Sequence, residues 1–460
     1  MLRGFTNGSE STALALVTLA RMAATNRDDP TASAVPSSND SAEDLVDDLP
    51  RVLYVGEHQI GTKNSTGVTL ADLYTGYPAE KITQLAPSLD GMPQVGHLVP
   101  IPRAIAPAVA LLAAAARAYV KLRPQGRGSV VIPHNAVRVP QPSFKTRLLV
   151  GLSAATDLSP VHLPSRLERS IRHRQPEVIH TIIGRVRTLK IALEVSRTLD
   201  IPIVPHVTDD WISTIFTNGE LRGFARRRTL QLVDELLQRS PALLVIGETM
   251  AEEYTSRYGK PCFVASAGID PVEFATPYQE GSRPKRLVYV GNPLVGRAAI
   301  ADQVGAFART RGWEVIVHPM LAERWKEMSS HVTVDKQLDP SDIPPILQRA
   351  DALLFPESLD PEIAAYTRLS FSTKAAQLIA AGRPILAIGP KGQGSIEEIR
   401  KHASRSYFLN SLDDSVLREA FDYLDNNLDS IRVETPRKYW SSTMRVSLQS
   451  ALRFATVRGH

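Results

Sequence analysis

The chain has 460 residues, of which 43% are hydrophobic, and its 53 Lys and Arg residues exceed its 48 Asp and Glu residues to give a formal net charge of +5. This length and composition predict a globular protein of two or three domains. The single cysteine excludes an intrachain disulfide and fits a cytoplasmic protein. The basic surplus is small and no fingerprint of a common nucleic-acid module is present, so we expect no nucleic-acid partner.

Residues 1–50 are expected to form a flexible lead-in, because residues 26–50 are rich in Ser, Asp and Pro and poor in large apolar side chains. No apolar run reaches the length that a bilayer span needs. The nearest candidate, residues 104–122, contains Pro107 and two basic residues. This composition favours a core helix or an interfacial amphipathic helix over a membrane span.

Two basic clusters occur at Arg166–Arg174 and Arg222–Arg228. Such clusters can meet membrane phosphates or an anionic substrate, although most are solvated helix faces. Peripheral contact with the inner face of the membrane therefore stays an open alternative for a protein that we place in the cytoplasm.

Short apolar runs recur between helical spacers in the first half of the chain. They begin at residues 51 (RVLYV), 129 (SVVIP), 177 (EVIHT), 201 (IPIVPHV), 243 (LLVIG) and 262 (CFVAS). Strands that alternate with helices predict a parallel, doubly wound sheet.

The first strand runs into GEHQIGTKNSTGVTLADLY, a loop rich in glycine and small hydroxyl residues. Such residues let the backbone approach a ligand before a helix begins, which makes Gly61, Thr62 and Thr66 candidate acceptor-side residues. A plain turn that caps the next helix explains them as well. The loop lacks the Gly-x-Gly-x-x-Gly spacing of a dinucleotide fingerprint, which disfavours NAD.

After Thr276 the chain becomes polar, and a second series of strands then opens with RLVYVG and continues through EVIVH, HVTV, DALLF and PILAI. We predict two Rossmann-like domains, residues 51–280 and 285–430, whose parallel sheets face each other across a cleft. Residues 431–460 should form a C-terminal helical segment, because Tyr439–Val457 has a helical pattern. This helix could cap either domain.

Residues 351–390 predict a strand, a long loop, a short helix and a second strand. Ser370 and two neighbouring hydroxyl residues can cap this helix, whose free N–H groups and positive dipole end favour an anion. Arg368 and Lys374 flank the same point, so a diphosphate here would meet backbone donors, hydroxyls and two cations. The alternative is an ordinary capped helix with solvated basic residues.

Four segments, in their order and spacing, resemble the retaining GT-B glycosyltransferases related to glycogen synthase and the bacterial polysaccharide transferases. They are LLVIGETMAEEYTSRYGKPCFVASAGIDPVEF, RLVYVGN, RADALLFPE and LSFSTKAAQLIAAGRPILAIGP. The resemblance extends from residue 51 to about residue 430. It implies the GT-B fold, with a nucleotide-sugar donor on the C-terminal domain and an acceptor on the N-terminal domain.

The resemblance also implies a set of residues around the donor diphosphate: Ser370, Phe371, Ser372 and Lys374. The clan commonly has two glutamates in this region, and this chain has Leu369 and Gln377 at the corresponding positions. Gln377 can still hydrogen-bond a ribose, whereas Leu369 cannot replace a carboxylate near the sugar. Either the chain belongs to a branch with a serine–lysine donor loop, or it has lost catalysis.

Glu357 and Glu362 lie upstream in the same loop. They could supply the missing carboxylate if the loop folds back, and the alternative is that they are solvated loop charges. A second departure follows RLVYVG, where many relatives place an arginine and then a lysine against the phosphates. Here Gly291 is followed by Asn292, and Arg297 is the remaining cation. Because negative charge grows on the leaving diphosphate, we expect three basic residues to share its neutralisation without a metal: Arg297, Arg368 and Lys374.

His206 lies in HVTDDW, at the end of a predicted strand, and resembles the histidine that relatives place near the donor sugar. Asp209 and Asp210 follow it, where either could act as a base or contact sugar hydroxyls. Aspartates after a strand also commonly cap the next helix. His206, Asp209 and Asp210 are the candidate catalytic residues.

These residues and the resemblance predict a metal-independent glycosyltransferase of the hexosyltransferase type that needs no cofactor. It would move a sugar from a nucleoside-diphosphate sugar to a carbohydrate or lipid-linked acceptor, as in polysaccharide biosynthesis. The resemblance alone implies that transfer proceeds with retention. A nucleotide-sugar epimerase or hydrolase of the same fold is the alternative among enzymes. A non-catalytic nucleotide-sugar-binding protein is the alternative outside them, and the sequence does not indicate the sugar, the nucleobase or the oligomeric state.

Overall fold

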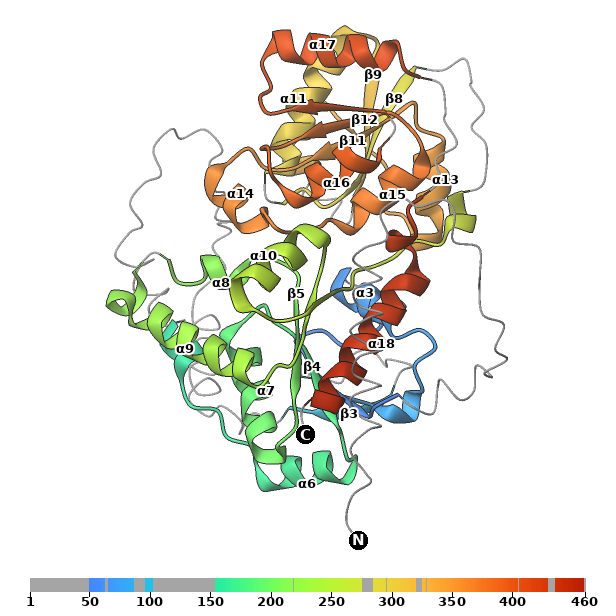
Figure 1. The fold of residues 1–460 in the computed structure, drawn as a ribbon. Helices are drawn as coiled ribbons and strands as arrows, with labels where there is room; N and C mark the ends of the chain where they lie inside the picture. Colours follow the sequence, from blue (N-terminus) through green and yellow to red (C-terminus); the bar gives the residue numbers. More distant parts are fainter. Residues whose placement is uncertain are drawn as a thin grey trace, which may run out of the picture.

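The computed structural model describes residues 49–62, 65–86, 96–101, 154–217, 219–274, 284–294, 296–319, 325–327, 329–403, 405–428 and 435–458. Within these ranges the chain forms two sheets, of seven and six strands, with helices packed around both (Figure 1). Every pairing between strands is parallel. The predicted α/β class with two parallel sheets is confirmed. Three predicted features lie outside the described residues: the lead-in up to residue 48, the segment 104–122 and the strand at residue 129.

The first sheet has the strand order β3-β2-β1-β4-β5-β6-β7. Its strands are β1 (Val52–Val55), β2 (Ile82–Ala86), β3 (His97–Pro100), β4 (Val178–Ile182), β5 (Ile203–Val207), β6 (Leu243–Val245) and β7 (Cys262–Val264). The apolar runs predicted all of them except β2 and β3. Strand β2 contains Thr83 and Gln84, which are buried polar residues, and the Gln84 side chain accepts a hydrogen bond from the Ile60 N–H at 2.9 Å. That hydrogen bond satisfies the buried Gln84 side chain. Because Gln84 is polar, the strand does not appear in the sequence as a continuous apolar run.

Helices cover both faces of this sheet. They are α3 (Ser65–Leu73), α6 (Ser165–His173), α7 (Val186–Leu199), α8 (Trp211–Thr214), α9 (Phe224–Gln238) and α10 (Glu248–Tyr258), with the 3₁₀ turns η1 (Ala79–Lys81), η3 (Glu220–Gly223) and η4 (Pro271–Phe274). Helix α7 shows why they pack: Val186, Leu189 and Leu193 recur at helical spacing and are buried. One apolar cluster joins α6, α7, α9 and α10 to the sheet, and a second joins α3.

The second sheet has the order β10-β9-β8-β11-β12-β13. Its strands are β8 (Lys285–Gly291), β9 (Trp313–Pro319), β10 (Thr333–Val334), β11 (Ala352–Pro356), β12 (Ile385–Ile388) and β13 (Ser406–Leu409). Its helices are α11 (Arg297–Thr310), α13 (Ile343–Gln348), α14 (Pro361–Thr367), α15 (Thr373–Ala381), α16 (Gly394–His402) and α17 (Asp414–Asp425), with the 3₁₀ turn η5 (Pro340–Asp342). The sequence predicted all of these strands except β13.

Helix α14 corrects one expectation, because it occupies part of the connection that was predicted as a long loop. The Asp360 side chain accepts hydrogen bonds from the N–H groups of Glu362 and Ile363 at 2.9 and 3.1 Å, and Pro361 stands at the first helical position. Aspartate followed by proline is a common helix start. The signal was therefore present in the sequence.

The last helix, α18 (Ser441–Arg458), follows the turn η6 (Arg437–Tyr439) and returns to the first sheet. Figure 1 shows it, in red, beside the blue and green elements of the N-terminal part. Met444, Leu448 and Leu452 lie in the same apolar cluster as β1 and α3. The predicted helix therefore caps the first sheet. We call residues 49–274 with α18 the N-terminal half, and residues 284–428 the C-terminal half.

Each sheet reverses its strand order once, between β1 and β4 in the first and between β8 and β11 in the second. Loops at the carboxyl ends of the strands diverge at such a point, and ligands of doubly wound sheets bind there. The residues that follow β1, β4, β8 and β11 are thus the ones to inspect. No helix in the described ranges is both long and apolar enough to cross a membrane.

Candidate functional site at the reversal point of the second sheet

An arginine–glutamate pair joins the loops that follow β8 and β11. The Arg297 guanidinium reaches both carboxylate oxygens of Glu357 at 3.1 and 3.0 Å and donates to the Pro356 carbonyl at 3.3 Å. The carboxylate is almost fully buried, with 4% of the side chain exposed, and the arginine side chain is 17% exposed. The side-chain oxygen of Asn292 accepts a further hydrogen bond from Arg297 at 3.4 Å. Of the two upstream glutamates, Glu357 is thus a buried ionic partner, whereas Glu362 is exposed.

Lys374 extends from the first turn of α15 toward the same reversal point. A Cβ atom at Gly291 would lie 2.8 Å from the Lys374 amine and 2.4 Å from the Tyr289 hydroxyl, so the absence of a side chain at Gly291 leaves room for this approach. In the part of the chain that the structure describes, the Lys374 amine has no hydrogen bond or ion pair. Burial and then the charge of Arg297 lower the pKa of Lys374 to about 8, against the opposing effect of Glu357. An anion bound here would remove this electrostatic penalty.

The N-terminus of α15 carries Lys374 without a side-chain cap. Ser372 occupies the N-cap position, as the sequence allowed, but its hydroxyl makes no capping bond to the helix. Its backbone N–H instead donates to the Ser395 hydroxyl at 2.8 Å. Free N–H groups at a helix start favour negative charge, and Lys374 adds a cation beside them. Gln377 lies one turn further along α15 and is partly buried.

The segment Arg368–Phe371 crosses to the N-terminal half. The Ser370 hydroxyl donates to the Asp209 carboxylate at 2.6 Å, and Arg368 pairs with Glu253 at 3.5 Å. Burial and then the charge of nearby Asp209 raise the pKa of Tyr366, on α14, to about 12. Asp209 is therefore the predicted catalytic residue that the structure brings to the predicted donor loop, by which we mean the connection from Pro356 to Phe371. No described contact joins Arg368 to Arg297 or Lys374.

Two apolar side chains of the same segment are also buried between the halves. Leu369 is 1% exposed and belongs to the apolar cluster of the N-terminal half. Phe371 stacks on Tyr439 with ring centres 5.5 Å apart, and a Cβ atom at Gly247 would lie 2.8 Å from the Phe371 Cβ. The side chain of Leu369 thus fills the core of the opposite half.

Asp210 has different surroundings from Asp209. It is buried, and one of its carboxylate oxygens accepts from the Ser213 and Tyr254 hydroxyls at 2.9 Å each. Arg257 lies 3.6 Å from the same oxygen. Asp210 stands at the N-cap position of α8 but makes no side-chain capping bond there. These contacts tie α8 to α10, while a catalytic role for Asp210 stays a prediction.

His206 lies in a buried cluster with another histidine and a tyrosine, beneath α3 and α18. Its Nε2 atom is 2.8 Å from the Ala265 carbonyl oxygen, and its ring stacks on His180 with centres 5.6 Å apart. His180 Nδ1 in turn lies 2.8 Å from the Tyr74 hydroxyl. No described contact joins His206 to the donor loop. Its catalytic role stays a prediction, and its packing indicates a contribution to stability.

This cluster predicts a loss of stability in mild acid. Burial lowers the pKa of His206 to about 4, against its bond to Ala265, and burial and then His206 lower the pKa of His180 well below its usual value. Both histidines are neutral when folded, whereas the unfolded chain binds protons below about pH 6.5. The free energy of unfolding should therefore fall by about 1 kcal/mol per pH unit for each histidine as pH drops from 6.5 toward 5.

Urea unfolding at several pH values measures this effect. The variant His206→Gln should have a shallower dependence than the unmodified protein over the same interval, because one titrating group is gone. The pKa of His402 is also lowered, by burial and then by Lys438, so the difference between the two proteins is the quantity to compare. Equal slopes would show that His206 is not held neutral.

The acceptor-side candidates follow β1, at the reversal point of the first sheet. Gly61 has a φ of +86° and donates its N–H to the Gly67 carbonyl at 2.9 Å. The Thr62 hydroxyl donates back to the Gln59 carbonyl at 2.9 Å, and Thr66 lies in the first turn of α3. The turn interpretation accounts for Gly61 and Thr62, and acceptor contact stays a prediction for all three residues.

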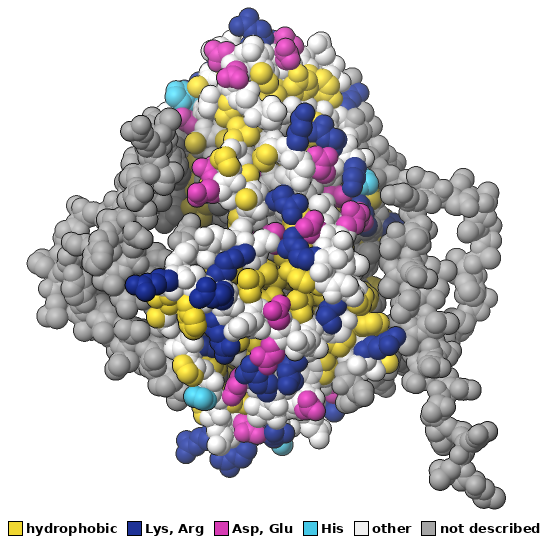
Figure 2. Space-filling model, turned by 60° about the vertical axis from the view of Figure 1, so that its left-hand side comes forward, with side chains coloured by type: hydrophobic (Ala, Val, Ile, Leu, Met, Phe, Trp, Pro, Cys, Tyr) yellow, Lys and Arg dark blue, Asp and Glu magenta, His cyan; other side chains and the backbone are white. Residues whose placement is uncertain are grey.

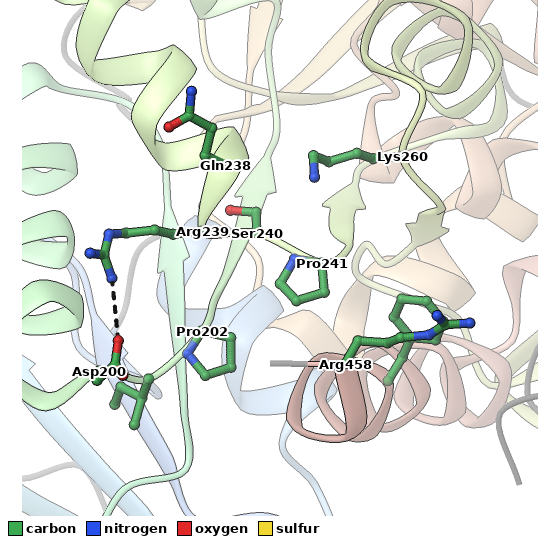
Figure 3. Close-up of a pocket in the computed structure, with 10 residues that line it drawn as sticks. Asp200, Pro202, Gln238, Arg239, Ser240, Pro241, Lys260 and Arg458 are labelled. Carbon is green, nitrogen blue, oxygen red and sulfur yellow. Dashed lines mark ion pairs between the residues drawn. The ribbon is translucent and has the colours of Figure 1, made fainter. Parts of the chain in front are cut away.

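A cavity of about 450 Å³ lies at the opposite edge of the first sheet, where β5, β6 and β7 begin (Figure 3). It is lined by Asp200, Ile201, Pro202, Gln238, Arg239, Ser240, Pro241, Lys260, Phe454 and Arg458. Its cations sit at the ends of α9, α10 and α18, where positive charge offsets the helix dipoles. None of the predicted site residues lines this cavity.

The chain has the GT-B fold, in which two parallel doubly wound sheets pack with their connecting segments in contact. In a comparison of structures, the chain is similar to HepE from Anabaena in complex with UDP and glucose, with a TM-score of 0.51 and 12% sequence identity over 87% of this chain and 98% of that one.

Weaker similarities link the chain to WaaG, a glycosyltransferase involved in lipopolysaccharide biosynthesis, and to the calicheamicin glycosyltransferase CalG4. Their TM-scores are 0.45 and 0.42, with 11% and 12% identity. They cover 86% and 88% of this chain and 94% and 95% of theirs. No protein-family profile and no curated protein sequence matches the chain.

Proposed function

We propose that the protein is a glycosyltransferase that takes its sugar, a hexose, from a nucleoside-diphosphate sugar bound at the reversal point of the second sheet. The observation that carries the proposal is the Lys374 amine, which is partly buried beside Gly291 and has no bonded partner among the described residues. Arg297 and the uncapped start of α15 lie at the same point. A diphosphate supplies the negative charge that this arrangement lacks.

In transfer, the bond between the sugar C1 atom and the diphosphate oxygen breaks, the acceptor hydroxyl oxygen forms a new bond to C1, and the hydroxyl proton passes to the leaving diphosphate. The electron pair of the broken bond stays on the diphosphate, where Lys374 and Arg297 would stabilise it without a metal or cofactor. We propose that Asp209 contacts the sugar or acceptor, since Ser370 links it to the donor loop. Retention and a carbohydrate or lipid-linked acceptor follow from the family resemblance.

Loss of the Lys374 charge should weaken nucleotide binding. The variant Lys374→Met is expected to bind a nucleoside diphosphate about 30-fold more weakly, because a charge-assisted contact contributes roughly 2 kcal/mol. Titration calorimetry with UDP, GDP, ADP and dTDP measures this change. In the unmodified protein, affinity should also fall as pH rises through about 8, where Lys374 loses its proton.

The matched control is Lys391→Met, which removes an exposed lysine from the same half and should leave affinity unchanged. The pH dependence should disappear in Lys374→Met and persist in Lys391→Met. If Lys374→Met binds the best nucleotide as tightly as the unmodified protein, the donor site is not at α15.

A nucleotide-sugar-binding protein without transferase activity is a second candidate, and the burial of Leu369 favours it. At the position where relatives carry a glutamate, this chain has an apolar side chain inside the N-terminal half. Incubation with a panel of nucleotide sugars and acceptors separates the candidates. Donor binding without transfer, hydrolysis or epimerisation would support the binding protein, whereas altered sugar without an acceptor would indicate the epimerase or hydrolase.

A further inference from the structure

The segment that leads into α9 presents apolar side chains to solvent. Phe224 is 52% exposed, which makes it the most exposed aromatic side chain in the described ranges, and Leu221 is 40% exposed. The two lie three positions apart at the junction of η3 and α9. A solvent-exposed phenylalanine next to an exposed leucine costs hydration free energy unless another surface covers both.

Arginines surround this apolar pair. Arg222, Arg227 and Arg228 are exposed, and Arg222 and Arg227 form no ion pair in the part of the chain that the structure describes. Arg226 instead donates to the Ile215 carbonyl at 2.7 Å and anchors the start of α9. Figure 2 turns this side of the molecule toward the reader and shows basic side chains beside hydrophobic ones on it. We call Leu221, Arg222, Phe224, Arg227 and Arg228 the α9 surface.

The backbone beneath the α9 surface is strained. Leu221 and Arg222 have φ values of 50° and 56°, and Phe216 has a φ of 50°. Residues with a Cβ atom rarely adopt this left-handed conformation, which persists where the surrounding structure enforces it and is common at functional sites. Both Leu221 and Arg222 adopt this conformation at an exposed turn.

The other basic cluster, Arg166–Arg174 on α6, lacks these features. Arg172 pairs with Glu168 at 2.8 Å and donates to the Thr198 carbonyl, and the apolar residues Leu167 and Ile171 are buried. It has the character of a solvated helix face.

We infer that the α9 surface docks on a lipid bilayer with anionic headgroups. Phenylalanine and leucine would enter the interface while the arginines contact lipid phosphates, and long arginine side chains can do so from the rim of an apolar patch. The apolar side chains lie beside exposed arginines, and an anionic bilayer offers phosphates to the arginines and an apolar interior to Leu221 and Phe224. The bilayer fits both features.

Helix α8 lies between Asp209 and the α9 surface in the chain, and it contacts α14 of the donor loop. A lipid-linked acceptor would then approach from the bilayer. This last consequence depends on the proposed glycosyl transfer, whereas the docking itself does not.

Co-sedimentation of the full chain with vesicles tests the docking without any nucleotide. We expect binding to vesicles that contain phosphatidylglycerol and much weaker binding to pure phosphatidylcholine. The variant with Arg222→Glu and Arg227→Glu should lose roughly 25-fold or more in partitioning, and the variant with Leu221→Ser and Phe224→Ser should lose roughly tenfold.

The matched control is Arg166→Glu with Arg169→Glu, which makes the same charge change on α6. Vesicle binding of this variant should change by less than about twofold, because salt screens surface charges that lie far from the contact. Circular dichroism and nucleotide affinity should be unchanged in every variant. No binding to anionic vesicles, equal binding to both vesicle types, or equal loss in the α6 control would each overturn the inference. Normal vesicle binding with no sugar transfer would instead contradict the proposed function.

Discussion

Replacing Glu357 with alanine is expected to lower the free energy of unfolding by about 3 to 5 kcal/mol. Removal of one member of a buried ion pair leaves the other as an uncompensated charge, which costs more than the pair itself contributes. Arg297 would keep its neighbour Lys374 but lose the carboxylate that it contacts through two oxygens. Urea unfolding followed by fluorescence and circular dichroism measures the change.

Two further variants show whether the cause is the unpaired charge. The double variant Glu357→Gln with Arg297→Met removes both charges at similar volume, and it should recover most of the lost stability. The single variant Glu362→Ala removes an exposed glutamate of the same connection and should change stability by less than about 0.5 kcal/mol. If the losses of stability caused by the single changes at Glu357 and Arg297 add up in the double variant, the two residues do not stabilise the protein as a pair.

The same pair should also influence the donor site. Glu357 is the group that raises the pKa of Lys374, against burial and Arg297. Without that carboxylate, Lys374 should lose its proton at a lower pH than in the unmodified protein. The pH at which nucleotide affinity begins to fall should therefore move below about 8 in Glu357→Gln.

Introducing at position 369 the carboxylate that the resemblance to glycosyltransferases would place there is the second change with a large expected effect. Leu369→Glu should destabilise the protein by about 4 kcal/mol and should not raise transferase activity. The substitution removes a buried apolar side chain and puts an ionisable group into the apolar cluster of the N-terminal half. Thermal and urea unfolding measure the stability, and sugar-transfer assays measure the activity.

Acidic pH should reduce this penalty, which distinguishes a buried charge from a steric defect. A buried glutamate has a raised pKa, so the folded variant holds its proton to higher pH than the unfolded chain. Stability relative to the unmodified protein should therefore worsen as pH rises above about 4.3. Leu369→Met preserves volume and apolar character, and it should cost less than about 1.5 kcal/mol. A stable, more active Leu369→Glu would mean that position 369 can face the sugar.

The strands of both sheets show why much of the fold is readable from the sequence. Buried parallel strands are short continuous apolar runs, so LLVIG and DALLF predicted β6 and β11 directly. Strand β2 went unrecognised, because Gln84 is polar and its hydrogen bond to Ile60 forms only in the folded chain. Helix α14 differs from the predicted loop for another reason: its Asp-Pro start at residues 360 and 361 is a local signal that competes with the polar, loop-like composition around it.

The donor loop shows the same division within the candidate site. The helix start at α15 and the lysine beside it follow from local pattern and from resemblance, and the structure places Lys374 at a strand-reversal point. The sequence alone does not show whether Glu357 or Glu362 forms an ion pair with Arg297, because both lie in the same polar connection. The tertiary structure buries Glu357 directly after β11, next to β8, and leaves Glu362 in solvent.

The sequence by itself determined the elements whose signals are local: the apolar strands, the helix periodicity and the serine–lysine start of α15. Only the tertiary structure decided which distant groups meet. It joined Ser370 to Asp209, buried Leu369 in the opposite half and placed His206 in a histidine–tyrosine cluster under α18. Periodicity arises within a few turns of chain and is visible in one segment. Contacts between segments far apart in the chain depend on how both sheets and all their loops pack together.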